Sequence, residues 1–284
     1  MKNSIYPCIW FNGNAKEAAE LYCAAFKNGE MKVCTPLVVT FEIDGKQLMG
    51  LNGGPNFKPN PSVSFFKICE SQDEIDKAWQ ILAENGKVMM PIDSYPWSSR
   101  YGWIEDKFGV SWQLSLGNFG ENQQAELFPS LMFTGDQSGN AEKAINFYTS
   151  LFKNSQVDTI ARYEAGEHDI EGNIKYGQFT IDGYKISAMD SSGPHQFSFD
   201  QGVSLVVNCD TQEEIDFFWL NLTEGGKEDR CGWCQDAFGL WWQIVPSVLG
   251  SLMSDPNKAP KVMEAFMKMK KFDIEALKSV ANAS

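Results

Sequence analysis

Apolar and polar positions alternate along the chain in short stretches, and each stretch has a counterpart further along. Ile5–Phe11 is rich in β-branched and aromatic residues, which predicts a strand, and Phe128–Phe133 repeats the pattern. Each stretch leads into a run with helical spacing of apolar residues, which starts after Asn14 in the first case and after Asn140 in the second. Asparagine is a preferred N-cap residue, so both are expected to cap a helix.

The segment after each helix has the pattern of a hairpin. Asp44-Gly45 and Asp182-Gly183 stand between stretches rich in apolar residues, and Asp-Gly is a strong signal for a two-residue hairpin turn. The strand pattern then starts again, at Val63–Ile68 in the first half and at Val203–Val207 in the second. The order of elements thus restarts inside each half.

A second helix follows in each half. Ser71-Gln-Asp-Glu74 and Thr211-Gln-Glu-Glu214 have the spacing of a capping box, in which the first and fourth residues satisfy each other's backbone N–H groups. The apolar residues that follow keep helical spacing, which assigns Trp79 and Trp219 to the core beneath the helix. Further strands are expected to close each half, at Tyr101–Glu105, Val110–Leu116, Cys231–Gln235 and Leu240–Val245.

The closing segments show that the chain is a duplication. Residues 103–114, WIEDKFGVSWQL, recur at residues 233–244 as WCQDAFGLWWQI, with Trp, Asp, Phe, Gly, Trp and Gln in the same places. The predicted domains are residues 1–118 and 126–247, joined by a polar linker at Gly117–Glu126 and followed by a helical tail at 248–284.

Each half is expected to hold two β-α-β-β-β modules, which makes the fold class α+β. Such a module has one sheet face covered by its helix and one face left open. We expect the two modules of a domain to enclose a cavity with their open faces, and a small ligand to bind there.

The composition narrows the classes of partner. The formal net charge is -13, and nucleic acids and anionic membrane surfaces attract clustered positive charge, so neither is an expected partner. No apolar run is long enough to span a bilayer, and Met1–Ser4 leads directly into the first strand, so a cytoplasmic location is expected.

The cysteines favour reduced thiols over a disulfide framework. Seven of them are scattered through apolar segments, as expected of buried thiols in a reducing compartment. Cys231-Gly-Trp-Cys234 has the spacing of a redox or zinc motif. It lies in a strand-like run, where positions i and i+3 face opposite ways, so two ordinary thiols are the favoured interpretation.

Several motifs, in this order and spacing, resemble one known family. They are the helix motif N-A-x-E-A-x-x-x-Y from Asn14 to Tyr22, the I-D-G hairpin followed by Gly53-Gly54-Pro55, the C-[ED]-[ST]-Q-[DE]-E-I-D capping segment and the G-W-x-x-D-x-F-G-x-x-W-Q closing hairpin. The chain resembles the PhnB-like family, also labelled 3-demethylubiquinone-9 3-methyltransferase-like. That family lies in the vicinal oxygen chelate superfamily with glyoxalase I, extradiol dioxygenases and bleomycin-resistance proteins. The resemblance covers both halves and the tail, and it implies tandem glyoxalase/bleomycin-resistance-like domains.

The resemblance also implies where a metal ion would bind. Metal-using relatives carry a glutamate ligand in the setting D-x-x-G-x-x-x-E, and the matching positions here are Gln113 and Gln243. A further ligand is expected early in the strand that opens the second module, where Ser64 and Ser204 are the nearest polar residues. A neutral glutamine oxygen is a weaker ligand for a divalent cation than a carboxylate. We therefore expect this chain to have the fold of its metal-using relatives but to bind no metal ion at these positions. We also expect it to use no cofactor.

The methyltransferase label gains no support from the residues. A Rossmann-type methyltransferase has a glycine-rich loop between a strand and a helix, whereas Gly53-Gly54-Pro55 follows a hairpin strand and precedes a proline-rich loop. The two histidines, His168 and His195, fall in polar loops of the second half and are interpreted as solvated residues. No Ser-His-Asp set can be built from them.

Candidate ligand-binding residues come from the closing strands and from the aromatic residues. Gln113 and Gln243 alternate with apolar neighbours, so they point either into the cavity or into a dry core where they satisfy backbone groups. Tryptophan suits the wall of a site for a planar or apolar ligand, although a single tryptophan is more often part of the core. The full set of candidates is Gln113, Gln243, Trp10, Trp97, Trp103, Trp233, Ser64 and Ser204.

Two further features of the closing hairpins are expected to be structural or to cover the site. Arg100 and Arg230 precede the two G-W motifs, and each is expected to form a salt bridge, with Asp106 and Asp236 as candidate partners. The insertion Tyr95–Ser99, present only in the first half, is a candidate lid.

The leading hypothesis is a metal-independent protein that binds an apolar or aromatic small molecule in a module-pair cavity. The alternative is an enzyme, a lyase, isomerase or methyltransferase-like protein, that acts on a quinone-like or small carbonyl substrate. A third hypothesis is an interaction role for the two halves, which are expected to pack as a pseudo-dimer within one chain. A further homodimer is left open.

Overall fold

The structure, a computed structural model, describes residues 4–117 and 125–283. The chain divides into two compact units, a larger one at Pro7–Val203 and a smaller one that combines Met1–Tyr6 with Ser204–Ser284. Most of the predicted linker Gly117–Glu126 lies outside the described residues. Among the described helices, none is long and apolar enough to cross a membrane.

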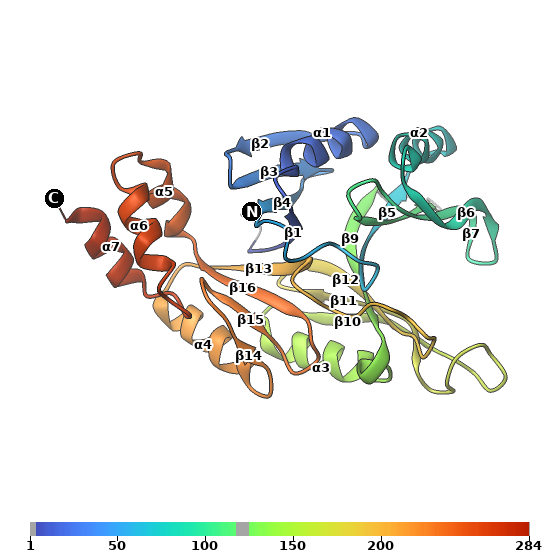
Figure 1. Ribbon diagram of the computed structural model, residues 1–284. Helices are drawn as coiled ribbons and strands as arrows, with labels where there is room; N and C mark the ends of the chain where they lie inside the picture. Colours follow the sequence, from blue (N-terminus) through green and yellow to red (C-terminus); the bar gives the residue numbers. More distant parts are fainter. Residues whose placement is uncertain (1–3, 118–124, 284) are drawn as a thin grey trace. The chain divides into compact units, whose positions relative to one another are not determined.

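The larger unit contains three β-α-β-β-β modules in succession (Figure 1). The first module is β1 (Ile5–Phe11), α1 (Ala15–Ala25), β2 (Glu30–Cys34), β3 (Val38–Ile43) and β4 (Lys46–Asn52). The second is β5 (Val63–Cys69), α2 (Gln72–Ala83), β6 (Lys87–Tyr95), β7 (Ser98–Glu105) and β8 (Ser111–Leu116). The third is β9 (Glu126–Phe133), α3 (Ala141–Leu151), β10 (Gln156–Arg162), β11 (Ile174–Ile181) and β12 (Tyr184–Asp190). A short 3-10 turn at Gly135–Gln137 precedes α3.

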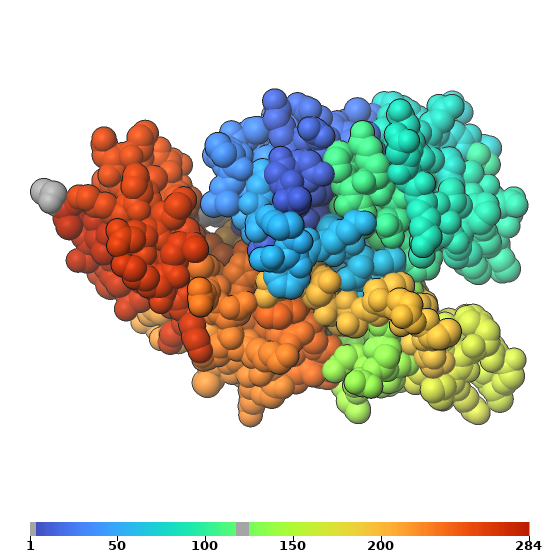
Figure 2. Space-filling view, viewed as in Figure 1, coloured from blue at the N-terminus to red at the C-terminus, as the bar shows by residue number. Residues whose placement is uncertain are grey.

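The smaller unit holds the fourth module and the tail. Its strands are in the order β14-β15-β16-β13, and its three tail helices form one compact cluster at the red end of the chain (Figure 2). The elements are β13 (Val203–Cys209), α4 (Gln212–Thr223), β14 (Lys227–Glu228), β15 (Trp233–Gln235), β16 (Trp241–Pro246), α5 (Val248–Ser254), α6 (Ala259–Phe266) and α7 (Ile274–Asn282). The four predicted modules are thus all present.

The main sheet of the larger unit joins the two sequence repeats. It has eight strands in the order β10-β11-β12-β9-β5-β8-β7-β6. Its central pair is antiparallel, with Val63 of β5 opposite Leu131 of β9. The second module is thus hydrogen-bonded along its edge to the third module, which belongs to the other repeat, whereas the sequence predicts only which faces are open. A strand pattern fixes which face is apolar, not which distant strand supplies the pairing edge.

α2 and α3 cover the same face of this sheet. Lys67 on β5 forms an ion pair with Glu74 of α2, and Gly177 on β11 lies against Ile145 of α3. The strand register places Lys67 and Gly177 on one face, because directly paired residues point to the same side. Within the described part of these two modules, the opposite face carries no α-helix, and the candidate site lies there.

The turn and cap signals have different outcomes. Both Asp-Gly turns form as predicted, with positive φ at Asp44 and Asp182 as well as at the glycines that follow. The two capping segments at the starts of α2 and α4 also form, and the second makes the complete reciprocal pair of bonds.

The two asparagine caps do not form. Asn14 and Asn140 occupy the N-cap positions of α1 and α3 but make no side-chain cap bond. Instead the Asn52 side chain accepts from the Ala15 N–H, and the Asp190 carboxylate takes the equivalent role at α3. The cap is supplied by the end of the last strand of the module, which a reading of the local sequence could not reveal.

An aromatic core joins the first two modules through their helices. The ring of Trp112 on β8 lies 4.8 Å from that of Tyr22 and 5.2 Å from that of Phe65 between ring centroids. The Trp112 indole N–H donates to buried Asp106, which also accepts from the N–H groups of Phe108 and Val110. The repeated D-x-F-G-x-x-W motif is therefore a turn built around a buried carboxylate, and Asp236 makes the same bonds in the fourth module.

Candidate functional site

Four serines lie side by side on the helix-free face of the eight-stranded sheet. Ser64 on β5 is the register partner of Ser111 on β8 and of Ser130 on β9. Ser130 is in turn the partner of Ser187 on β12. None of the four is more than 8% exposed, and the Ser187 hydroxyl has no hydrogen-bond partner within the described part of the chain. We refer to Ser111, Ser64, Ser130 and Ser187 as the serine row.

Gln113 is held between two hydroxyl groups beside this row. The Tyr101 hydroxyl donates to Gln113 Oε1 at 2.6 Å, and Gln113 Nε2 donates to Ser64 Oγ at 2.7 Å. All three side chains are almost fully buried, at 4%, 8% and 2% exposure. Two of the predicted site residues, Gln113 and Ser64, are thus in direct contact, and Tyr101 fixes the orientation of the amide.

Aromatic side chains flank the hydrogen-bond chain. Phe66 is the register partner of both Gln113 and Phe128, and the Phe66 and Phe128 rings stack with centroids 5.3 Å apart. Trp103 on β7 is the register partner of Gln113 on β8, and the Trp103 indole N–H donates to Ser111 Oγ at 2.6 Å. The predicted residue Trp103 therefore belongs to the same group.

Trp97 is close to Tyr101 but outside the buried group. It lies at the tip of the β6–β7 hairpin, 59% exposed, and stacks on Tyr95 with centroids 5.1 Å apart. Both rings also meet Tyr101 edge-on, at 5.6 Å. The Tyr95–Ser99 insertion thus forms an aromatic tip that contacts Tyr101, a position compatible with the predicted lid.

The smaller unit carries a reduced copy of this arrangement. Gln243 Nε2 donates to Ser204 Oγ at 3.0 Å, and Trp233 is the register partner of Gln243. The position of Tyr101 is taken by Cys231, whose thiol points to the Phe266 carbonyl. Three predicted residues, Gln243, Ser204 and Trp233, are brought together, but without a tyrosine to hold the amide oxygen.

Trp10 is separate from both groups. Its strand, β1, pairs with β4, and its indole N–H donates to the Gly54 carbonyl at 2.7 Å. A Cβ at Gly53 would lie 2.2 Å from the Trp10 ring, so the Gly53-Gly54-Pro55 segment forms a turn packed on this ring. Trp10 is thus part of the local packing of that turn.

The donor set does not fit a divalent metal ion. Both ends of the Gln113 amide are engaged, and its neighbours in the row are neutral hydroxyls, whereas Zn²⁺, Mg²⁺ and Ca²⁺ sites rely on carboxylate, imidazole or thiolate ligands. Across residues 4–117 and 125–283, no group of three or more His, Cys, Asp or Glu side chains is placed to hold a metal ion.

The charged and titratable groups near the site are few. Burial raises the pKa of Tyr101 well above its ordinary value, so its hydroxyl stays protonated and donates to Gln113 at neutral pH. Lys185 on β12 binds Glu126 and lies 5.9 Å from the centre of the Phe128 ring. The centre of the site is therefore polar but uncharged, with the Lys185–Glu126 ion pair at one edge and Glu105, the register partner of Ser111, at another.

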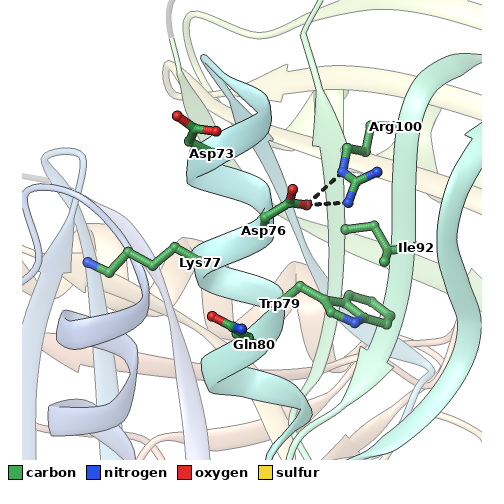
Figure 3. A pocket seen from close by; sticks show the side chains of 7 residues that line it. All are labelled: Asp73, Asp76, Lys77, Trp79, Gln80, Ile92 and Arg100. Atoms are coloured by element: carbon green, nitrogen blue, oxygen red, sulfur yellow. Dashed lines mark hydrogen bonds and ion pairs between the residues drawn. The ribbon is translucent and has the colours of Figure 1, made fainter.

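The other predicted contacts lie elsewhere. Arg100 binds Asp76 of α2 (Figure 3), not Asp106, whose carboxylate is already occupied by the turn that it organises. His168 contacts the Tyr163 hydroxyl, and His195 lies 2.7 Å from Ser191 Oγ. His168 is exposed, as its interpretation as a solvated loop residue expects, and His195 is half-buried.

The sequence did not reveal Tyr101, Phe66, Ser130 and Ser187 as members of the site. Period-two alternation places Ser130 on the same strand face as Phe128, so the direction of the Ser130 side chain could be predicted. The neighbours of Ser130 and Ser187 could not be predicted, because β9 and β12 are brought to the site only by the pairing of β5 with β9. Residues of different repeats therefore form one site.

Comparisons with known proteins agree with this architecture. No curated protein matches the chain. A PhnB protein from Bacillus cereus is 33% identical over 39% of this chain and 98% of its own, with a TM-score of 0.37. Glyoxalase I from Zea mays is 12% identical over 84% of this chain and 89% of its own, with a TM-score of 0.56, which shows a shared fold.

The family model of 3-demethylubiquinone-9 3-methyltransferase matches residues 3–115 and again 125–245. The two matches coincide with the two sequence repeats, and the chain has the tandem glyoxalase/bleomycin-resistance-like fold of the vicinal oxygen chelate superfamily. The chain therefore belongs to the 3-demethylubiquinone-9 3-methyltransferase family, which includes the PhnB-like proteins.

Proposed function

We propose that the larger unit binds a planar aromatic molecule that carries an oxygen acceptor, without a metal ion. The observation that carries the proposal is the hydrogen-bond chain from Tyr101 through Gln113 to Ser64, on the sheet face that also holds the Phe66–Phe128 stack. Ligand sites commonly combine apolar and aromatic walls with a few fixed polar groups, and this face has both.

The direction of the hydrogen-bond chain determines what the site offers. Ser64 accepts from Gln113, so its own hydroxyl proton remains free to be donated. Gln113 has two amide protons and uses one of them on Ser64, and the Ser187 hydroxyl is unpaired. The site therefore presents hydrogen-bond donors beside aromatic rings, which suits a ketone, a quinone-like carbonyl or an aromatic ether.

The same donors would polarise a carbonyl substrate, which is the form that an enzymatic role would take. Proton abstraction also needs a base. The buried Tyr101 is held in its protonated form, and a carboxylate on this face, that of Glu105, is opposite Ser111. Neither histidine of the chain lies on the strands that carry the serine row. We therefore propose binding, with a lyase, isomerase or methyltransferase-like activity as the alternative.

Calorimetric titration with 1-tetralone, an aromatic ketone, tests the proposal. Its carbonyl-free counterpart tetralin has nearly the same shape, so the difference between the two reports the hydrogen bonds. We expect one molecule of 1-tetralone to bind per chain, and tetralin to bind about tenfold more weakly, as the loss of hydrogen bonds worth about 1.4 kcal/mol would give.

A matched pair of variants locates the binding. Gln113→Leu keeps the side-chain size, removes the amide and should weaken 1-tetralone binding at least tenfold, while Gln243→Leu should leave it unchanged. Equal affinity for 1-tetralone and tetralin, or equal effects of the two variants, would contradict the proposal. Elemental analysis checks the metal-free part: a stoichiometric divalent metal that is lost with Gln113→Ala would overturn it.

A further inference from the structure

A second tyrosine–glutamine pair lies on the helix-free face of the eight-stranded sheet, in the third module. The Tyr176 hydroxyl donates to Gln178 Oε1 at 3.0 Å. Tyr101 and Gln113 make the same bond in the second module. Gln178 on β11 is the register partner of Ser187 on β12, so it continues the serine row by one strand. The row thus has an amide held by a tyrosine near each of its two ends.

The second pair leaves hydrogen-bond donors unused. Within residues 4–117 and 125–283, Gln178 Oε1 accepts from Tyr176, whereas Gln178 Nε2 makes no hydrogen bond. The neighbouring Ser187 hydroxyl is unpaired too, although it is completely buried. An unpaired buried polar group lowers stability, so such groups are commonly satisfied by water or by a bound molecule. Gln178 is only half-buried, so a ligand can reach its amide.

The charged groups around the second pair are engaged with their neighbours. Lys185 binds Glu126, and Asp158 accepts from the Thr180 hydroxyl. Burial, and then the Glu126 and Asp158 carboxylates, raises the pKa of Tyr176 to about 12, so its hydroxyl stays protonated and keeps donating. Lys185, Glu126 and Asp158 together carry one net negative charge. This end of the face therefore disfavours a carboxylate or phosphate and favours a neutral oxygen acceptor.

The curvature of the sheet brings the two ends of the row towards each other. α2 and α3 lie on the same face of the sheet, yet Figure 1 shows them on opposite sides of the strands β5, β9 and β12. The sheet therefore curves between the helices, with the helix-free face on the inside. Ser64 and Gln178 are three strands apart, about 14 Å on a flat sheet, and the curvature shortens this separation. Such a separation suits a bicyclic aromatic molecule with a polar group at either end.

We propose that the molecule bound on this face carries a second neutral oxygen acceptor, which the Gln178 amide binds at the opposite end from Gln113. This ligand class rests on the proposed function, in which Gln113 and the Phe66–Phe128 stack take the first acceptor and the ring. Both anchors offer donors, so the ligand is an aromatic diketone, keto-ether or keto-amide. Each repeat contributes one anchor, so neither repeat alone would hold both ends of the ligand.

Calorimetric titration with two bicyclic ketones of equal size tests the proposal on the full chain. One is 6-acetyl-1-tetralone, which has a second carbonyl across the ring, and the other is 6-isopropyl-1-tetralone, with a carbon branch of the same shape instead. We expect the acetyl compound to bind about fivefold more tightly, the ratio given by one hydrogen bond worth about 1 kcal/mol. Gln178→Leu should abolish this preference, whereas Gln113→Leu should weaken both compounds by the same factor.

The matched control is Gln156→Leu, the same substitution on the neighbouring strand β10, where the exposed Gln156 is opposite Thr180. It should leave the preference for the acetyl compound unchanged. Tyr176→Phe should lower the preference to about twofold, because the Gln178 amide loses the hydroxyl that orients it. Far-ultraviolet circular dichroism confirms that each variant keeps the fold.

Three results would overturn the second anchor and leave the proposed function standing. They are equal affinity for the two compounds while Gln113→Leu still weakens both, a preference that survives Gln178→Leu, and a preference that Gln156→Leu removes as completely as Gln178→Leu does. If neither compound binds, and 1-tetralone does not bind either, the proposed function fails and the second anchor fails with it.

Discussion

The two copies of the Gln–Ser pair have the same backbone setting but different surroundings. In the larger unit Gln113 is fixed by Tyr101 and Ser64, next to Phe66 and Ser111. In the smaller unit the residues at the positions of Tyr101, Phe66 and Ser111 are Cys231, Val206 and Trp241. The scaffold that places the glutamine is duplicated, while the aromatic and hydroxyl groups around it are found in one copy. This difference favours a single binding site per chain.

The two copies also differ in the way their second helices are anchored. Beneath α2, Lys67 is completely buried and binds Glu74 at 3.2 Å and Asp44 at 3.0 Å. At the matching position beneath α4 stands Val207, and Glu214 is exposed. The first copy thus contains a buried ionic network where the second has an apolar contact.

The largest expected effect concerns this network. Glu74→Gln should lower the free energy of unfolding by about 3 kcal/mol, because it leaves the buried Lys67 short of one compensating charge. Glu214→Gln should cost less than about 1 kcal/mol, since the same carboxylate is exposed there. Urea denaturation of both variants measures the difference.

A second variant shows whether the charge is responsible. Lys67→Met in the Glu74→Gln background should recover part of the loss, because the uncompensated charge is removed. Equal losses for Glu74→Gln and Glu214→Gln would mean that the capping bonds, which both glutamates make, matter more than the buried charge.

A smaller effect is expected at the proposed binding site. Tyr101→Phe removes the hydroxyl that orients Gln113 and should weaken 1-tetralone binding about fivefold, in line with a hydrogen bond worth about 1 kcal/mol. Cys231→Ala changes the matching position and should alter the affinity less than twofold. A larger effect of Cys231→Ala in the same titration would place the binding in the smaller unit.

The smallest expected difference is between the buried thiols of the two copies. Burial raises the pKa of Cys69 and of Cys209 to about 12, from an ordinary value of 9.0. The folded state then holds a proton that the unfolded state releases above pH 9, so the free energy of unfolding falls as the pH rises. Between pH 8.5 and 9.5 we expect each thiol to account for about 0.7 kcal/mol of this fall.

Denaturation at several pH values measures the thiol effect in Cys69→Ala and Cys209→Ala. Each variant should show a shallower alkaline loss of stability than the unsubstituted chain, and by the same amount. A steeper loss in either variant, or a difference between the two as large as the effect itself, would show that the two thiols do not share the same environment.

Local signals in the sequence were enough to predict much of the fold. The Asp-Gly turns, the capping segments and the alternation of strand residues gave the four modules, because each depends on residues close together in the chain. The family motif also located Gln113 and Gln243, and the structure gives both a serine partner, Ser64 and Ser204.

Other features depended on residues far apart in the sequence. The caps of α1 and α3 come from Asn52 and Asp190 at the ends of distant strands, although the local pattern pointed to asparagines beside the helices. The helical spacing of Trp79 indicated a core residue, but its ring lies over Gly102 on β7 and is only half-buried. Helical spacing shows which face of a helix is apolar, and the elements packed on that face decide how far each residue is buried.

The sequence by itself determined the duplication, the four modules and the place of the two glutamines in the closing strands. Only the tertiary structure decided that β5 pairs with β9, which assembles the serine row from both repeats, and that the tail packs on α4. The physical reason is that turn chemistry and residue periodicity act over a few residues, whereas strand register and helix docking depend on how complementary two distant surfaces are.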